Sequence, residues 1–206
     1  FELHCSFKIV PNNNQGFANS GIQYRSHISD PKNWVVGGYQ ADFEAGTTYS
    51  GILYEEGGRG ILAQRGQKVV LKAGEKNPVP VGSVGKSEDI QAAIKKEDWN
   101  EYVVVAQGNH LIHKINGLVS VDVTDEQTDK RAMSGVLALQ LHAGQPMTVQ
   151  FKNIRLKRLK LAARKKIVMV AGTQSHGPGD HEFNAGVLLL KQCLDKTPGV
   201  VAAAYL

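Results

Sequence analysis

Residues 101–123, EYVVVAQGNHLIHKINGLVSVDV, read as three short β-strands separated by two tight turns. Apolar side chains recur at every second position in the strands, which is the pattern of a strand that buries one face. The turns are QGN at 107–109 and ING at 115–117, and Asn-Gly tolerates the positive φ angles of a type I′ hairpin. This stretch therefore predicts a β-sheet protein whose neighbouring strands are joined by hairpins.

The same organisation extends outward from this stretch over residues 1 to about 157. Turn-forming clusters such as NNNQG, GGRG and AGQP separate the apolar runs. The predicted strands cover residues 1–10, 20–26, 37–44, 51–56, 60–64, 67–72, 101–107, 110–115, 118–123, 134–142 and 147–157. Many short strands at this spacing favour an all-β fold, a β-sandwich. One helix is expected over SEDIQAAIKKEDW, with Ser87 as its N-cap, after a loop NPVPVGSVGKS.

The pattern changes after residue 157. KKIVMVAG is a continuous apolar strand, NAGVLLLKQCLDK has helical spacing, and VVAAAYL is a second apolar run, which together form a βα unit of a parallel sheet. About forty residues are too few to complete such a domain. We therefore predict a β-sandwich over 1–157, a basic linker over 158–164 and the opening of an α/β domain over 165–206.

The net charge of +5 is concentrated in one run, residues 151–166, which holds eight Lys or Arg and no acid. The run lacks interleaved aromatic residues, so a solvated strand end with a linker is favoured over a nucleic-acid site. No apolar run is long enough to span a membrane. Cys5 and Cys193 are expected to be buried free thiols. FELHCSFKIV already alternates as a strand, so we expect the natural chain to begin before residue 1.

Strand alternation places polar pairs on one side of several predicted strands. These pairs are Gln23 with Arg25, Gln40 with Asp42, and Gln140 with His142. On the last of these strands, 134–142, three leucines point the other way, toward an expected core. They are Leu137, Leu139 and Leu141.

Two interpretations of this polar side remain open on composition alone. It is either a solvated sheet face or a groove that hydrogen-bonds a sugar, with aromatic rings nearby for stacking. Asp42 and Arg25 would also suit a cross-strand ion pair. Glu55 and His113 share their faces with leucines, and His113 would also suit a core histidine. His176, Asp180, His181 and Glu182 resemble metal ligands, but a capped loop is favoured because their spacing fits no standard site.

Five motifs in order carry a resemblance over residues 1 to about 157. NSGIQYRS, GYQADF, GILYEEGGRGIL, DWNEYVVVAQGNHLIHKINGLVSVDVTD and SGVLALQLHAGQPMTVQFKNIRLK resemble the 3-keto-disaccharide hydrolase family. The resemblance implies a concanavalin A-like jelly-roll sandwich with a concave carbohydrate-binding face. KKIVMVAGTQSHGPGDHEFNAGVLLLKQCL resembles the start of a ThuA-like domain. The resemblance also implies a bacterial protein with a periplasmic or secreted location.

The implied activity is cleavage of 3-keto-glycosides by C2 deprotonation, β-elimination of the C1 substituent and hydration. Such chemistry needs a base, an acid and donors for the C3 oxygen. The expected catalytic residues are His113, His142, Glu55 and Asp42. The expected substrate-binding residues are Gln23, Arg25, Gln40, Arg59 and Gln140. We expect no cofactor, although a divalent cation would also serve beside the C3 oxygen.

The expected partners are a carbohydrate ligand and the ThuA-like domain of the same chain, with neither nucleic acid nor a membrane. The alternative is a lectin-like module that binds a glycan without turnover for its ThuA-like partner, because a fold does not determine a function. Catalysis requires a histidine and a carboxylate in one enclosed pocket. A lectin requires only a shallow groove.

Overall fold

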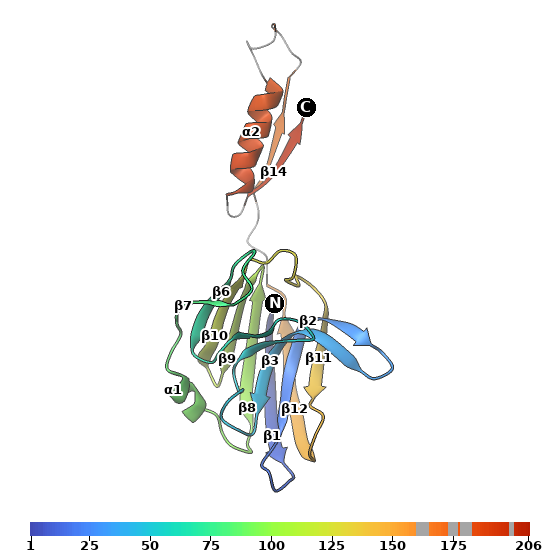
Figure 1. The fold of residues 1–206 in the computed structure, drawn as a ribbon, viewed down its shortest axis with the longest axis vertical. Coiled ribbons are helices and arrows are strands. Elements are labelled where there is room, and N and C mark those ends of the chain that lie inside the picture. Colours follow the sequence, from blue (N-terminus) through green and yellow to red (C-terminus); the bar gives the residue numbers. More distant parts are fainter. Residues whose placement is uncertain (160–164, 173–176, 178–182, 198–199) are drawn as a thin grey trace. The chain divides into compact units, whose positions relative to one another are not determined.

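The computed structural model describes residues 1–159, 165–172, 177, 183–197 and 200–206. Its internal contacts divide the chain into two compact units, Phe1–Leu159 and Lys160–Leu206. Figure 1 shows the strands and helices of each unit. Among the described residues no helix has both the length and the apolar content to cross a bilayer.

The first unit contains a seven-stranded sheet with the order β12-β1-β8-β9-β10-β6-β7. Neighbouring strands run antiparallel except β10 and β6, which are parallel. The strands are β1 (Glu2–Pro11), β6 (Gln67–Leu71), β7 (Val79–Ser83), β8 (Asn100–Gln107), β9 (His110–Ile115), β10 (Leu118–Asp125) and β12 (Met147–Lys157). The 101–123 stretch therefore forms three consecutive antiparallel strands of one sheet, as the sequence predicts.

A five-stranded antiparallel sheet, with the order β11-β2-β3-β4-β5, forms the second layer of the sandwich. Its strands are β2 (Asn19–Asp30), β3 (Val35–Glu44), β4 (Leu53–Glu56), β5 (Gly60–Ala63) and β11 (Val136–Leu141). Strands β2 and β3 extend beyond the predicted ranges and form a hairpin arm that projects from the sandwich (Figure 1). The predicted β-sandwich is confirmed.

The core lies between the two sheets and is rich in aromatic rings. Phe7 of β1 packs against Phe43 of β3 with a centroid separation of 4.0 Å, so the contact joins the two layers. Tyr24, Tyr39 and Tyr102 are at most 1% exposed. Burying such rings supplies a large part of the hydrophobic stabilisation, roughly 25 cal/mol per Å² of apolar surface removed from water.

The three leucines of β11 do not enter this core, and that expectation was wrong. Leu137, Leu139 and Leu141 are 45%, 46% and 67% exposed. The reason is that β11 is the edge strand of its sheet, and β12 is the corresponding edge of the other sheet. Between them lies an open hollow of about 230 Å³ that Ile154 of β12 also lines.

Three local expectations also change. The helix α1 is only Ser87–Ala92, and its N-cap position is Lys86, which makes no side-chain capping bond, so Ser87 is not the cap. The segment read as a loop contains β7, which pairs with the edge of β6. Cys5 is buried as expected, but Cys193 is exposed. Both cysteines are free thiols.

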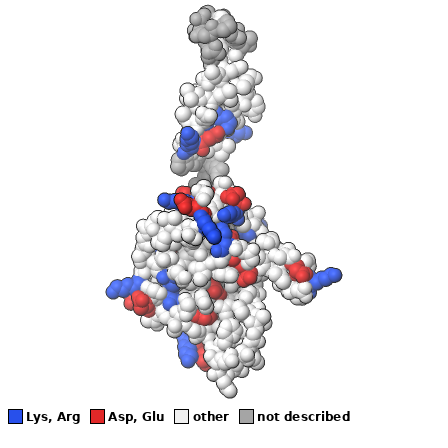
Figure 2. Space-filling view, in the orientation of Figure 1, with Lys and Arg blue, Asp and Glu red and all other residues white. Residues whose placement is uncertain are grey.

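The charged residues of the first unit do not gather into one basic patch on the face shown in Figure 2, where both signs are interspersed. Within the basic run, Lys152 lies over the ring of Trp99, 3.7 Å from its centroid. That cation–π contact gives one basic side chain an intramolecular partner.

The second unit has the predicted order of strand, helix and strand. These elements are β13 (Lys165–Val170), α2 (Phe183–Asp195) and β14 (Val200–Tyr205), and β13 pairs with β14 in parallel. The predicted linker residues 160–164 lie outside the described residues, as do His176, Asp180, His181 and Glu182. The ThuA-like assignment of this unit stays a prediction.

Candidate functional site

A pocket of about 300 Å³ opens on the side of the five-stranded sheet that faces away from the core. Its polar lining consists of Asn19, Gln40, Asp42, Glu56, Gln140 and His142. Its remaining lining consists of Tyr49, Ile52, Tyr54 and Ile61. Directional polar groups beside aromatic rings are the surface chemistry that suits a sugar.

Strand register explains why these residues meet. Gly21 of β2 pairs with Gln140 of β11 on one side and with Asp42 of β3 on the other, so the three form one row across the sheet. In the neighbouring row, Gln40 pairs with Tyr54. Directly paired residues point to the same face of a sheet. The side chains of both rows therefore lie on the face where the pocket opens.

Gly21 leaves the centre of the first row free of a side chain. A Cβ atom at this position would lie 2.5 Å from Cγ of Gln40. The Gln40 side chain therefore occupies space that only a glycine leaves open. This close approach fixes where the Gln40 amide lies in the pocket.

Asp42 is the buried titratable group of the pocket. It is 6% exposed, and its Oδ1 accepts from Nε2 of Gln40 at 3.3 Å and from Nδ2 of Asn19 at 3.4 Å. Burial raises the pKa of Asp42 to about 7, because the two long hydrogen bonds only partly replace the hydration of the carboxylate. A carboxyl group with this pKa can accept or release a proton near neutral pH.

His142 follows the end of β11 and is exposed. Its ring meets Phe17 edge-to-face, with 5.4 Å between centroids, and its Nδ1 contacts the carbonyl oxygen of Ala143. A carbonyl oxygen only accepts, so this contact makes Nδ1 the donor. Nε2 is then the ring nitrogen that a bound ligand can contact.

Of the nine residues predicted from the sequence, four line this pocket. They are Gln40, Asp42, Gln140 and His142. The other five lie elsewhere, and for Glu55 and His113 the leucines on the same strand face had already indicated this.

Arg25 leaves the polar face because the pairing of β2 with β3 shifts register between Tyr24 and His27. Arg25 itself has a left-handed backbone, with φ of 48°. Its Nη1 donates to the carbonyl oxygens of Gly108 and Ala132 at 2.7 and 3.3 Å. The register shift thus sends the guanidinium toward Gly108 and Ala132, and the alternative of an ion pair between Arg25 and Asp42 is absent from the described contacts.

Gln23 pairs with Gln40 across the sheet, yet its amide is used within the chain. Nε2 of Gln23 donates to the carbonyl oxygen of Val36 at 2.7 Å. Gln23 is 3% exposed. It therefore supports the backbone of β3.

His113 is a core histidine in this structure. It is 0% exposed, with Nε2 2.9 Å from the Tyr24 hydroxyl and Nδ1 3.3 Å from the Tyr102 hydroxyl. Burial lowers the pKa of His113 to about 3, so the ring is neutral at physiological pH. Its surroundings do not suit proton exchange with a ligand, and His113 is not among the residues that line the pocket.

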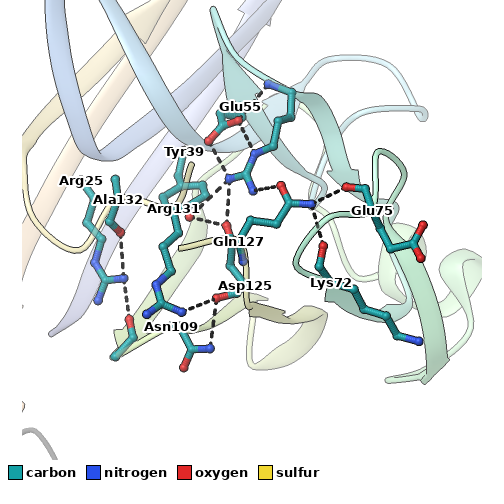
Figure 3. A network of polar contacts seen from close by, with 12 residues as sticks. Arg25, Tyr39, Glu55, Lys72, Glu75, Asn109, Asp125, Gln127, Arg131 and Ala132 are labelled. Carbon is teal, nitrogen blue, oxygen red and sulfur yellow. Dashed lines mark hydrogen bonds and ion pairs between the residues drawn. The ribbon is translucent and has the colours of Figure 1, made fainter. Parts of the chain in front are cut away.

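Glu55 and Arg59 belong to a separate network at one end of the core, shown in Figure 3. Arg59 pairs with Glu55 at 2.6 Å and with Asp125 at 2.8 Å, and its Nη1 donates to Gln127 at 3.1 Å. The Tyr39 hydroxyl donates to Asp125 at 2.6 Å. Arg59 is thereby held by the chain's own groups.

Sequence reasoning selected Glu55 where the pocket contains Glu56. The two are neighbours on β4 and point to opposite faces, Glu55 with Leu53 and Glu56 with Tyr54. Tyr54 lies on the same strand face as Glu56, and an aromatic side chain beside a carboxylate was a signal in the sequence for the side that carries the pocket. Asn19, at the start of β2, was missed because it precedes the predicted strand.

Among the described residues, no group of three or more His, Cys, Asp or Glu side chains is arranged to hold a metal ion. The divalent cation considered from the sequence therefore has no ligand set in the described part of the chain.

A family model described as 3-keto-alpha-glucoside-1,2-lyase-like domain matches residues 1–157. The search of curated proteins found no match.

The solved structures to which the chain is similar include the carbohydrate-binding module CBM66 from Bacillus subtilis. It has a TM-score of 0.42 and 12% identity, with 74% of this chain and 73% of that chain covered. A proposed glycosyl hydrolase from Parabacteroides distasonis has a TM-score of 0.42 and 18% identity, with 77% of each chain covered. A second structure from the same organism has a TM-score of 0.39 and 18% identity, with 74% and 69% covered.

Proposed function

Because the chain belongs to the family of 3-keto-alpha-glucoside-1,2-lyase-like domains, we propose that it cleaves 3-keto-glycosides in the pocket on the five-stranded sheet. The observation that carries this proposal is the gathering of Asp42 and His142 in one pocket, beside side-chain amides and tyrosines. A base and an acid in one cavity are what an elimination requires.

In the proposed reaction Asp42, as the carboxylate, removes the proton at C2, which the neighbouring C3 ketone makes acidic. The electron pair of the C2–H bond moves toward the C3 oxygen and forms an enolate. The enolate then collapses to a C1–C2 double bond as the C1–oxygen bond breaks. Protonated His142 gives its Nε2 proton to the departing oxygen. Addition of water across the double bond restores C2–H and completes a net hydrolysis.

The electrostatics of the pocket are compatible with this first step. As Asp42 becomes neutral, the negative charge moves to the sugar, so the total charge in the pocket stays constant. The amide nitrogens of Asn19 and Gln140 are the proposed donors to the C3 oxygen, the role that preorganised donors play in enzymes. A pKa of about 7 leaves a substantial fraction of Asp42 ionised at neutral pH.

Replacing His142 with alanine is expected to lower turnover of a 3-keto-glucoside by about 10²–10⁴-fold, the usual contribution of a general acid. The melting temperature should change little, because the side chain is exposed. The measurement is product formation from 3-keto-trehalose and 3-keto-lactose, with the unoxidised disaccharides as blanks. His27→Ala, at an exposed position outside the pocket, is the matched control.

If H142A turns over substrate at the wild-type rate, the assigned acid is wrong. If the wild-type protein binds the 3-keto sugar without any product, the lectin-like alternative replaces the proposed enzyme. The assay thus separates catalysis from binding.

A further inference from the structure

The pocket contains two buried amide oxygens that have no hydrogen-bond partner among the described residues. They are Oε1 of Gln40 and Oε1 of Gln140. Burying an acceptor without a hydrogen-bond partner is unfavourable, so such atoms call for a donor from a bound ligand.

The orientation of the Gln40 amide follows from its neighbours. Gln40 is 3% exposed, and its Nε2 donates to Asp42 at 3.3 Å. A carboxylate only accepts, which assigns the nitrogen to that side of the amide and the oxygen to the other. The Gln40 side chain occupies the space that Gly21 leaves open, which fixes the position of this amide. The unpaired acceptor is therefore a built feature of the pocket.

The charged groups that line the pocket also favour a ligand that brings hydrogen-bond donors. Asp42 and Glu56 contribute carboxyl groups, and no Lys or Arg is among the described residues that line it. A ligand that suits such a lining brings hydrogen-bond donors and no negative charge. The free hydroxyl groups of a neutral sugar meet both conditions, and a methylated, missing or carboxylate-replaced hydroxyl does not.

We propose that Gln40 and Gln140 are specificity-determining residues that read free hydroxyl groups of an uncharged sugar unit through their unpaired amide oxygens. This inference rests on the proposed function and deepens it. A polar group that loses its only partner discriminates strongly against the analogue that lacks it. The pocket therefore rejects sugars whose recognised hydroxyls are removed or blocked.

The test measures kcat/KM of the whole chain for a 3-keto-glucoside and for analogues altered at one position. The analogues are 4-deoxy, 6-deoxy, 6-O-methyl and 6-carboxylate. At least one deoxy analogue and the carboxylate are expected to lose on the order of 10–100-fold in kcat/KM. Gln40→Leu and Gln140→Leu each remove one acceptor. In the variant that lacks the acceptor for a given hydroxyl, the loss of kcat/KM caused by removing that hydroxyl should shrink to about threefold or less, as a double-mutant cycle requires.

Gln150→Leu, on the exposed side of β12, is the matched control and should retain the wild-type discrimination. The inference is overturned if every deoxy analogue has a kcat/KM within threefold of that of the parent sugar. It is also overturned if a deoxy analogue loses the same factor in kcat/KM in the wild type and in both pocket variants. A 6-carboxylate processed as well as the parent does the same. In each of these cases the parent is still cleaved, so the proposed function survives. Failure to process the parent overturns the proposed function, and the inference with it.

Discussion

Replacing Asp42 with asparagine is expected to abolish turnover and, at the same time, to make the folded protein more stable. The first effect follows because asparagine cannot accept the C2 proton, so kcat should fall by at least about 10²-fold. The second follows from burial. Asp42 is 6% exposed, and no Lys or Arg is among the described residues that line its pocket.

The stability effect depends on pH in a defined direction. The pKa of Asp42 is about 7 in the folded protein and lies near 4 in an unfolded chain. The folded state therefore binds the proton more tightly. The stability that protonated Asp42 contributes is fully present below about pH 4 and is lost as the pH rises through about 7. Asparagine carries no charge, so D42N avoids that loss.

The free energy of unfolding of D42N should exceed that of the wild type by about 2–4 kcal/mol at pH 8. The difference should shrink steadily toward pH 4. Urea unfolding at pH 4, 6 and 8 measures it, alongside a turnover assay at pH 7. Asp129→Asn, at an exposed position, is the control for the charge change itself. A D42N variant that is less stable than the wild type at pH 8 contradicts this account of the buried carboxyl group.

Replacing Arg59 with alanine should cause the opposite result, a large loss of stability. Arg59 neutralises Glu55 and Asp125, whose side chains are 11% and 1% exposed. Removing one partner of a buried ionic network leaves uncompensated charge in a low-dielectric region, at a cost of about 3–5 kcal/mol. The Gln127 amide and the Tyr39 hydroxyl lose a partner as well, as the contacts in Figure 3 indicate.

A surface ion pair provides the comparison for this second variant. Lys68 lies 3.4 Å from Asp122, and its side chain is 51% exposed. Exposed pairs contribute at most about 1 kcal/mol, so Lys68→Ala should barely change the unfolding midpoint. Denaturant unfolding of both variants at pH 7 gives the two values. If R59A costs no more than K68A, the network does not stabilise the fold in the way proposed.

The network also bears on the candidate site through the β4–β5 hairpin. Glu55 and Arg59 belong to this hairpin, and so do Tyr54, Glu56 and Ile61, which line the pocket. Anchoring the hairpin to Asp125 of β10 therefore fixes one wall of the pocket. Loss of Arg59 is expected to disturb the pocket as well as the fold.

The sequence by itself determined the strands and most of their faces. Alternation and turn residues are local properties, so the three strands of 101–123 and the common face of Gln40 and Asp42 could be predicted without any tertiary information. The same alternation also brought Gln140 and His142 to the side where the pocket opens.

The tertiary structure alone decided which polar residues meet. The register shift after Tyr24 turned Arg25 away, and nothing in the local pattern signals it. The position of β11 at a sheet edge left Leu139 exposed although its pattern is that of a buried strand. Register and edge position depend on the partners that a strand finds across the sheet. A chain read one segment at a time does not contain that information.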